Sequence, residues 1–148
     1  MPLPVGTIHH LRMTVTDVAR SKQFYTEVLG FEVAVDGPPP PSDKSYAEIV
    51  DSLQGGIILT HQGMFFGLRP AGADRATSGD CFDALRVGLD HLSFSVPSRA
   101  DLDQAVALLD AGGVEHGPIR ELQALGLAFL AFFDPDWIAL ELSAPIAD

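Results

Sequence analysis

Apolar and polar positions alternate at two places in the chain, and helical spacing follows each of them. The first run is "HHLRMTVTD", residues 9–17, and the second is "DHLSFSVPS", residues 90–98. Alternation is typical of a strand with one buried face, and apolar steps of three and four residues predict an amphipathic helix. The sequence therefore predicts the same strand and helix twice. Aligning His10 with His91 also aligns Leu11 with Leu92, Met13 with Phe94, Val15 with Val96 and Asp17 with Ser98.

The ends of the two helices are marked by capping residues. Asp17 and Ser98 are expected N-caps, and Asp101 stands three residues after Ser98, as a capping box requires. Gly30 and Gly112 follow the last apolar positions, where a left-handed residue ends a helix.

Three strand-like runs follow each helix. They are "FEVAV", "GIILTH" and "MFFGLRP" in the first half, then "VEHGPI", "LAFLAFF" and "WIALELSA" in the second. A short helix is expected in "SYAEIVDSLQGG". The pattern predicts one α+β domain over 1–148, with βαβββ modules at 5–70 and 88–145 and a linker at 71–87. Similar patterns recur in unrelated α+β chains, so internal duplication is a hypothesis.

Strand alternation assigns side chains to faces. His10 and Arg12 fall opposite the apolar residues of the first strand, as His91 does in the second half and Glu141 in the last strand. Arg69 is expected on the same kind of face. His9 points the other way, so only His10 of the adjacent pair is a candidate for this face.

Two histidines and one carboxylate form a recognised metal set. Imidazole nitrogen and carboxylate oxygen suit a divalent ion such as iron, manganese, nickel or zinc, and three protein ligands leave positions open for substrate. The alternative is a solvated face that carries ordinary histidine and glutamate side chains.

The composition limits the classes of binding partner that are expected. The formal net charge is −11 with only nine Lys and Arg residues, which argues against nucleic acid and anionic membranes. No apolar run reaches the roughly 20 residues that span a bilayer, and no secretory signal is apparent at the N-terminus. The single cysteine, Cys81, favours a reducing cytoplasm. A small molecule is the expected partner.

Three stretches carry a resemblance to a known family. "IHHLRMTVTDVARSKQFYTEVLGFEV", "GLDHLSFSV" and "FFDPDWIALELSAP" closely resemble the vicinal oxygen chelate superfamily, which includes glyoxalase I, extradiol dioxygenases, fosfomycin-resistance transferases and bleomycin-binding proteins. The resemblance implies an α+β fold in which two βαβββ modules place curved mixed sheets around an open metal-binding cup.

Residue by residue, the resemblance implies that His10, His91 and Glu141 are metal ligands, with Glu141 also catalytic. Glyoxalase I-like members have a fourth ligand at the position of Gly67, so this chain is expected to be of the three-ligand type. Trp137 stands where "DPDG" is commoner, and it either flanks the pocket or covers the sheet end. Arg12, Arg69 and Trp137 are the substrate-binding candidates, although both arginines could instead form salt bridges.

The expected function is that of a metal-dependent enzyme with one divalent metal ion (Fe, Mn, Ni or Zn). It would chelate a small oxygen-bearing molecule through two oxygens and act by Lewis-acid or iron and oxygen chemistry, as a lyase, isomerase, transferase or dioxygenase. The alternative is a protein of the bleomycin-resistance type that sequesters a drug or metabolite. A homodimer is expected, with modules paired within or between chains.

Overall fold

The chain folds into two compact units. The computed structural model describes residues 3–76, 79 and 81–146. Unit 1 comprises Met1–Asp80 and unit 2 comprises Cys81–Asp148. The boundary between them falls inside the predicted linker at 71–87, and each unit contains one sheet.

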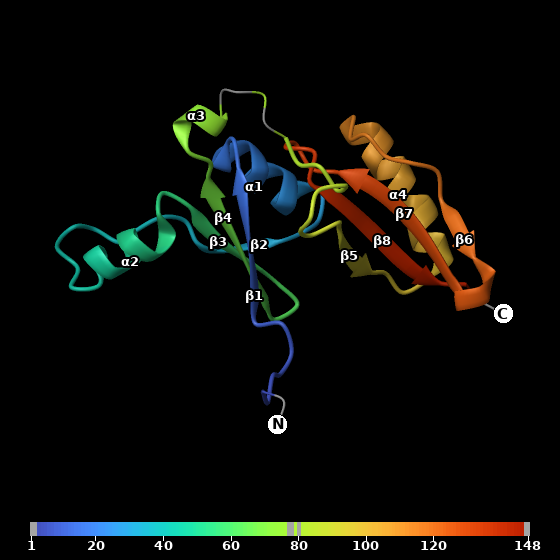
Figure 1. Cartoon of the computed structure of the whole chain (residues 1–148), viewed down its shortest axis with the longest axis horizontal. Coiled ribbons are helices and arrows are strands. Elements are labelled where there is room, and N and C mark those ends of the chain that lie inside the picture. The colour runs from blue at the N-terminus through green and yellow to red at the C-terminus, as the bar shows by residue number, and fades with distance from the viewer. Residues whose placement is uncertain (1–2, 77–78, 80, 147–148) are drawn as a thin grey trace. The chain divides into compact units, whose positions relative to one another are not determined.

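Unit 1 contains a four-stranded mixed sheet in the order β1-β4-β3-β2. Strands β1 and β4 are parallel, whereas β4 with β3 and β3 with β2 are antiparallel. Helix α1 connects β1 to β2 and packs against β4 (Figure 1). The elements are β1 (His10–Val15), α1 (Val18–Glu27), β2 (Glu32–Val35), α2 (Tyr46–Leu53), β3 (Ile57–His61), β4 (Met64–Pro70) and α3 (Ala73–Ala76).

Unit 2 repeats this topology. Its four-stranded sheet has the order β5-β8-β7-β6, with β5 and β8 parallel and the other pairs antiparallel. The elements are β5 (Leu92–Ser95), α4 (Arg99–Gly112), β6 (Arg120–Leu122), the 3-10 helix η1 (Gln123–Leu125), β7 (Leu127–Phe133) and β8 (Ala139–Pro145). The prediction of an α+β fold with two βαβββ modules is confirmed.

One face of each sheet is apolar and covered by a helix. In unit 1, Met13 and Phe66 are buried on the side of α1, where the Tyr25 hydroxyl donates to the Met13 sulfur at 3.3 Å. In unit 2, α4 packs against β7 and β8 and buries Leu102 and Leu109. The opposite face of each sheet, turned away from α1 or α4, is called its far face below, and it carries the polar positions that alternation predicts.

Local capping follows the sequence closely. Asp17 Oδ1 accepts a hydrogen bond from the Arg20 N–H at 3.0 Å, and the Ser98 N–H donates to Asp101 Oδ2 at 2.8 Å. These contacts confirm both predicted N-caps. One helix end differs, because α4 continues through Gly112 and Gly113 takes the left-handed conformation, with φ 64°.

The predicted strand "VEHGPI" is wrong. His116 forms only an isolated bridge with Phe132, and the Gly117 N–H donates to the Ala131 carbonyl at 2.8 Å. Pro118 has no N–H to continue the ladder, so regular pairing starts only at β6, from Arg120 onward. The segment therefore runs alongside β7 at the edge of the sheet without forming a regular strand.

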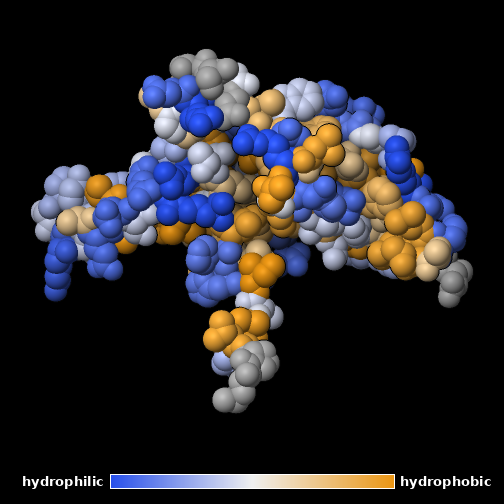
Figure 2. Space-filling model, in the orientation of Figure 1, coloured by the Kyte–Doolittle hydropathy of each residue, from blue (hydrophilic) through white to orange (hydrophobic). Residues whose placement is uncertain are grey.

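Some apolar side chains lie outside the two cores. Figure 2 shows hydrophobic side chains gathered over the turn that joins β6 to β7, where Leu122, Leu125 and Leu127 are exposed. These leucines therefore add little to the core of unit 2. None of the helices in the described part of the chain has the length and hydrophobicity that crossing a bilayer requires.

Candidate functional site

His91 and Glu141 approach each other on the far face of the unit 2 sheet. His91 lies directly before β5, and Glu141 lies within β8, where it pairs with Ser93. The distance from His91 Nε2 to Glu141 Oε1 is 3.8 Å. A nitrogen and a carboxylate oxygen at this separation can both point toward one cation.

A neighbouring carboxylate orients the His91 ring. His91 Nδ1 lies 2.5 Å from Asp90 Oδ1. An ionised carboxylate only accepts hydrogen bonds, so Nδ1 is the donor to Asp90, and the corresponding neutral tautomer has its lone pair on Nε2. Metal-binding histidines usually donate their other ring N–H in this way, which fixes the tautomer and raises the basicity of the ligand nitrogen. The nitrogen that faces Glu141 is therefore the one with a lone pair available in this tautomer.

Two serine hydroxyls hold the Glu141 carboxylate. Ser93 Oγ and Ser143 Oγ each donate to Glu141 Oε1 at 2.9 Å, and the two hydroxyl oxygens lie 2.7 Å apart. Both serines come from the far face, one from β5 and one from β8. These contacts restrict the carboxylate rotamer, as the outer contacts of a ligand carboxylate commonly do.

His10 lies on the far face of the unit 1 sheet and lines a cavity of about 440 Å³. Most of the lining is apolar, including Leu53, Ile57 and Phe65. His9 lines the same cavity, and its Nδ1 lies 3.0 Å from His10 Nδ1. The expectation that His9 points away is thus wrong, because β1 begins at His10 and strand alternation does not constrain the residue before it.

Arg12 lies across Gly67 on this far face. A Cβ atom at Gly67 would come within 3.0 Å of Arg12 Cγ, so the arginine stem fills the space that a side chain would need. Arg12 Nη2 donates to the Leu53 carbonyl at 2.8 Å, at the end of α2. Both Arg12 and Gly67 line the cavity that contains His10.

Strand register relates these residues to those of unit 2. Arg12 pairs with Gly67 across β1 and β4, and Ser93 pairs with Glu141 across β5 and β8. Since the two sheets share one topology, Gly67 is the counterpart of Glu141. One unit thus carries a carboxylate at this register, and the other carries a glycine covered by an arginine.

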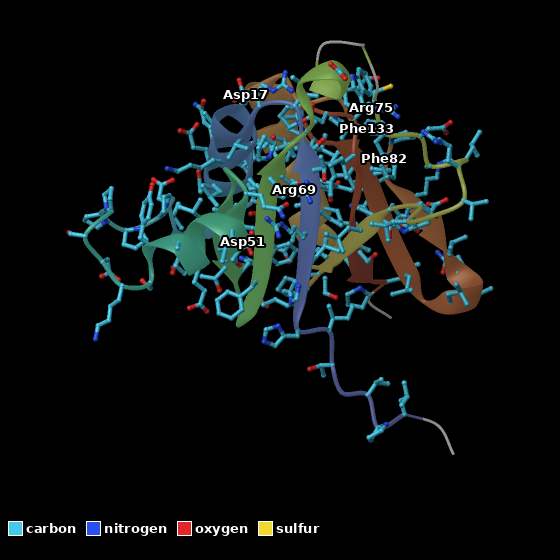
Figure 3. The ribbon with its side chains drawn as sticks, turned by 60° about the vertical axis from the view of Figure 1, so that its left-hand side comes forward. Asp17, Asp51, Arg69, Arg75, Phe82 and Phe133 are labelled. Atoms are coloured by element: carbon cyan, nitrogen blue, oxygen red, sulfur yellow. The ribbon has the colours of Figure 1, made fainter. Side chains whose placement is uncertain are left out.

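The remaining substrate-binding candidates occupy different places. Arg69 lies two residues beyond Gly67 and pairs with Thr14, and Figure 3 shows it against β4 at the border with β1. Trp137 lies in the turn between β7 and β8, where its side chain is 48% exposed and packs beside Phe133 with ring centroids 5.4 Å apart.

The other histidines lie away from the far faces. His61 stacks on Phe31 with ring centroids 4.7 Å apart, on the side of α1. His116 Nε2 lies 3.2 Å from Asp110 Oδ1 of α4. Hydrogen bonds to the Gly117 carbonyl and to Asp110 raise the pKa of His116.

The structure brings two of the three predicted ligands close together. His91 and Glu141 meet in unit 2, and His10 belongs to unit 1. Among the described residues, no cluster of three or more His, Cys, Asp or Glu side chains is arranged to hold a metal ion. Sequence reasoning missed Asp90 and the role of the two serines, although the adjacent pair Asp90-His91 and the spacing of Ser93 and Ser143 along their strands were available signals.

Comparisons with known proteins match nearly the whole chain. Residues 7–142 match a sequence model described as the glyoxalase/bleomycin resistance protein/dioxygenase superfamily. YwkD of Bacillus subtilis, an uncharacterised protein, is 34% identical over 136 residues, which cover 92% of this chain and 94% of that protein. YaeR of Escherichia coli, also uncharacterised, is 33% identical over 144 residues, covering 95% and 97%.

A solved structure agrees with these relatives. A glyoxylase/bleomycin resistance protein/dioxygenase domain from Frankia sp. EAN1pec has a TM-score of 0.71 and 31% sequence identity, covering 95% of this chain and 93% of that one. The match extends across both units and includes their shared topology. The chain belongs to the glyoxalase/bleomycin resistance protein/dioxygenase superfamily, also called the vicinal oxygen chelate superfamily.

Proposed function

We propose that the protein is a metal-dependent enzyme in which His10, His91 and Glu141 bind one divalent ion. The observation that carries the proposal is the arrangement in unit 2, where His91 Nε2 and Glu141 Oε1 lie 3.8 Å apart and Asp90 orients the imidazole. Members of this superfamily commonly bind a divalent metal and act on small molecules, typically as dimers. Iron, manganese, nickel and zinc all suit one carboxylate and two imidazole ligands.

The donor set fits such an ion. Asp90 leaves the lone pair of His91 on Nε2, and Ser93 and Ser143 hold Glu141 in one rotamer. When bound, a divalent ion supplies Lewis-acid stabilisation of negative charge that develops on a substrate oxygen. The chain itself orients the ligands and offers a largely apolar cavity beside His10, in which the less polar part of a small substrate can lie.

The proposed substrate is a small molecule that presents two oxygens to the ion. Three protein ligands leave coordination positions for a bidentate substrate. Gly67 cannot coordinate through a side chain, which favours the three-ligand type over the glyoxalase I type. The reaction would be a lyase, isomerase, transferase or dioxygenase step, and Glu141 is the residue proposed to act in catalysis as well as in binding.

The first test is the metal content of untagged protein, measured by inductively coupled plasma mass spectrometry. We expect about one divalent ion per chain. His91→Ala should lose this metal, because the imidazole prepared by Asp90 is removed. His61→Ala is the matched control, since His61 stacks on Phe31 on the other side of its sheet, and this variant should retain the metal.

Two outcomes would contradict the proposal. Full metal content in His91→Ala would exclude His91 as a ligand. Protein that takes up no metal after incubation with iron, manganese, nickel and zinc would favour the sequestering alternative, which calorimetry with a cationic glycopeptide would then test.

A further inference from the structure

We propose that the far face of the unit 1 sheet binds a carboxylate group of the substrate through Arg12, with Arg69 contributing positive charge. This inference rests on the proposed function, because it names the class of molecule that the metal site would act on. It predicts an organic monocarboxylate whose carboxylate binds Arg12, whose two further oxygens are free for the proposed ion, and whose small aliphatic or aromatic part lies in the cavity of unit 1.

The first argument is that equivalent paired positions in the two units carry opposite charges. In unit 2, Ser93 of β5 pairs with Glu141 of β8. At the equivalent place in unit 1, Arg12 of β1 pairs with Gly67 of β4. Gly67 leaves room for the Arg12 stem, since a Cβ there would come within 3.0 Å of Arg12 Cγ. The position that presents a negative group in one unit therefore presents a positive group in the other.

The second argument is that the Arg12 guanidinium is held in place. Its Nη2 donates to the Leu53 carbonyl at 2.8 Å, a bond that uses one of the five guanidinium N–H groups. The group still has donors for an acceptor in the cavity that Arg12 lines. Because the stem lies against Gly67 and the head is anchored, less side-chain entropy is lost when a ligand binds.

The third argument is uncompensated positive charge. In the part of the chain that the structure describes, neither Arg12 nor Arg69 forms an ion pair, and Arg69 Nε is buried without a hydrogen-bond partner. The two arginines are diagonal neighbours on one sheet face, where like charges repel. Arg12 is exposed and Arg69 is half-buried, so an external anion can reach this positively charged part of a chain whose net charge is −11.

The lining of the cavity favours a carboxylate over a phosphate. Apart from Arg12, its polar side chains are His9, His10 and Ser52, and the remaining residues are apolar or glycine. A phosphate dianion has more oxygens to satisfy and is commonly held by several backbone N–H groups. A carboxylate matches one edge of a single guanidinium, and Leu53, Ile57 and Phe65 can contact an attached apolar group.

The experiment uses the full-length chain in its metal-free form. Metal is removed over a chelating resin, because a soluble chelator such as EDTA is itself a carboxylate. Amide ¹H–¹⁵N spectra are recorded while 3-methylbutanoate or its neutral analogue 3-methylbutanamide is added. We expect saturable shifts at Arg12, Leu53 and Gly67 with the carboxylate, and at least about tenfold weaker binding of the amide.

Variants separate the charge from the shape of the site. Arg12→Gln should weaken binding of 3-methylbutanoate by about tenfold or more, and Arg12→Lys should restore part of it. Arg20→Gln is the matched control, because it removes the same charge from α1 of the same unit, and its affinity should equal that of the wild type. Well-dispersed spectra verify that each variant is folded.

Several results would overturn the inference. They are an absence of saturable shifts with the wild-type protein, equal affinity for the amide, unchanged affinity in Arg12→Gln, and tighter binding of inorganic phosphate than of the carboxylate. Metal content of the same variants is measured separately. Carboxylate binding by a protein that takes up no metal would support this site and contradict the metal-dependent function, so the two failures are distinguishable.

Discussion

Trp137 is a large side chain at a backbone position that favours glycine. Its φ is 63°, a left-handed conformation that costs a residue with a Cβ roughly 1 kcal/mol. The turn is fixed by Asp134, whose Oδ1 accepts hydrogen bonds from the N–H groups of Asp136 and Ile138 at 2.8 and 2.9 Å. The strain therefore comes from a turn that its own hydrogen bonds hold in place.

We expect Trp137→Gly to be more stable than Trp137→Ala by about 1 kcal/mol. Both variants lose the contact with Phe133, but only glycine relieves the left-handed strain. Urea unfolding of the two variants measures the difference. An alanine variant as stable as the glycine variant would show that the turn changes conformation when the indole is removed.

Gly67 is required by the packing of Arg12 rather than by its backbone conformation. We expect Gly67→Ala to destabilise the chain by about 1 kcal/mol, because the new Cβ would crowd Arg12 Cγ at 3.0 Å. In an Arg12→Ala background this cost should disappear, since alanine is otherwise tolerated in a strand. A double-mutant cycle by chemical unfolding measures the coupling, and additive effects would contradict the prediction.

At the scale of elements, the sequence predicted most of the strands well. The limits of β4 and β7 match the predicted runs residue for residue, because buried apolar positions and adjacent turns define both ends. The segment from Val114 to Ile119 failed because Pro118 interrupts the ladder within an otherwise strand-like composition. His9 failed for a related reason, since alternation applies only to residues inside a strand.

His116 connects this irregular segment to α4 through its contact with Asp110, and the strength of this contact depends on pH. Its hydrogen bonds to the Gly117 carbonyl and to Asp110 raise its pKa above the ordinary value of 6.5. The folded chain therefore binds this proton more tightly than the unfolded chain does. The resulting stabilisation is fully present below the unfolded pKa and is lost as the pH rises through the higher folded pKa.

Between about pH 6 and about pH 8, we expect the free energy of unfolding to fall less in His116→Gln than in the wild type. Chemical unfolding of wild type and variant across this range measures the difference, and the other histidines are common to both proteins. Asp110→Asn should remove part of the effect, because the Gly117 carbonyl remains. Identical pH profiles for wild type and His116→Gln would contradict the assignment.

At the scale of the whole molecule, the sequence predicted two halves of a site. Alternation within β1 and β8 agrees with the predicted faces of His10 and Glu141. His91 lies directly before β5, and its Nε2 is 3.8 Å from Glu141 Oε1. The adjacent pair Asp90-His91 was a visible signal that went unused, whereas the packing of Arg12 over Gly67 depends on a side-chain conformation that alternation does not specify. The joining of the halves in one metal site stays a prediction.

If both units supply ligands, His10→Ala should lose the metal as completely as His91→Ala does. Mass spectrometry of each purified variant tests this expectation, and full metal content in His10→Ala would exclude His10. Mixing the two variants then identifies the pairing of modules. A dimer that joins modules from different chains regains one intact ligand set, whereas a chain that uses its own modules regains none.

The packing of Arg12 on Gly67 also limits how this protein can evolve. A glutamate at position 67 would restore the counterpart of Glu141, but the arginine stem occupies its space. Loss of Arg12 alone would leave neither an acidic side chain nor a cation at that register. If Arg12 binds a carboxylate as proposed, a change from one kind of site to the other would require positions 12 and 67 to change together.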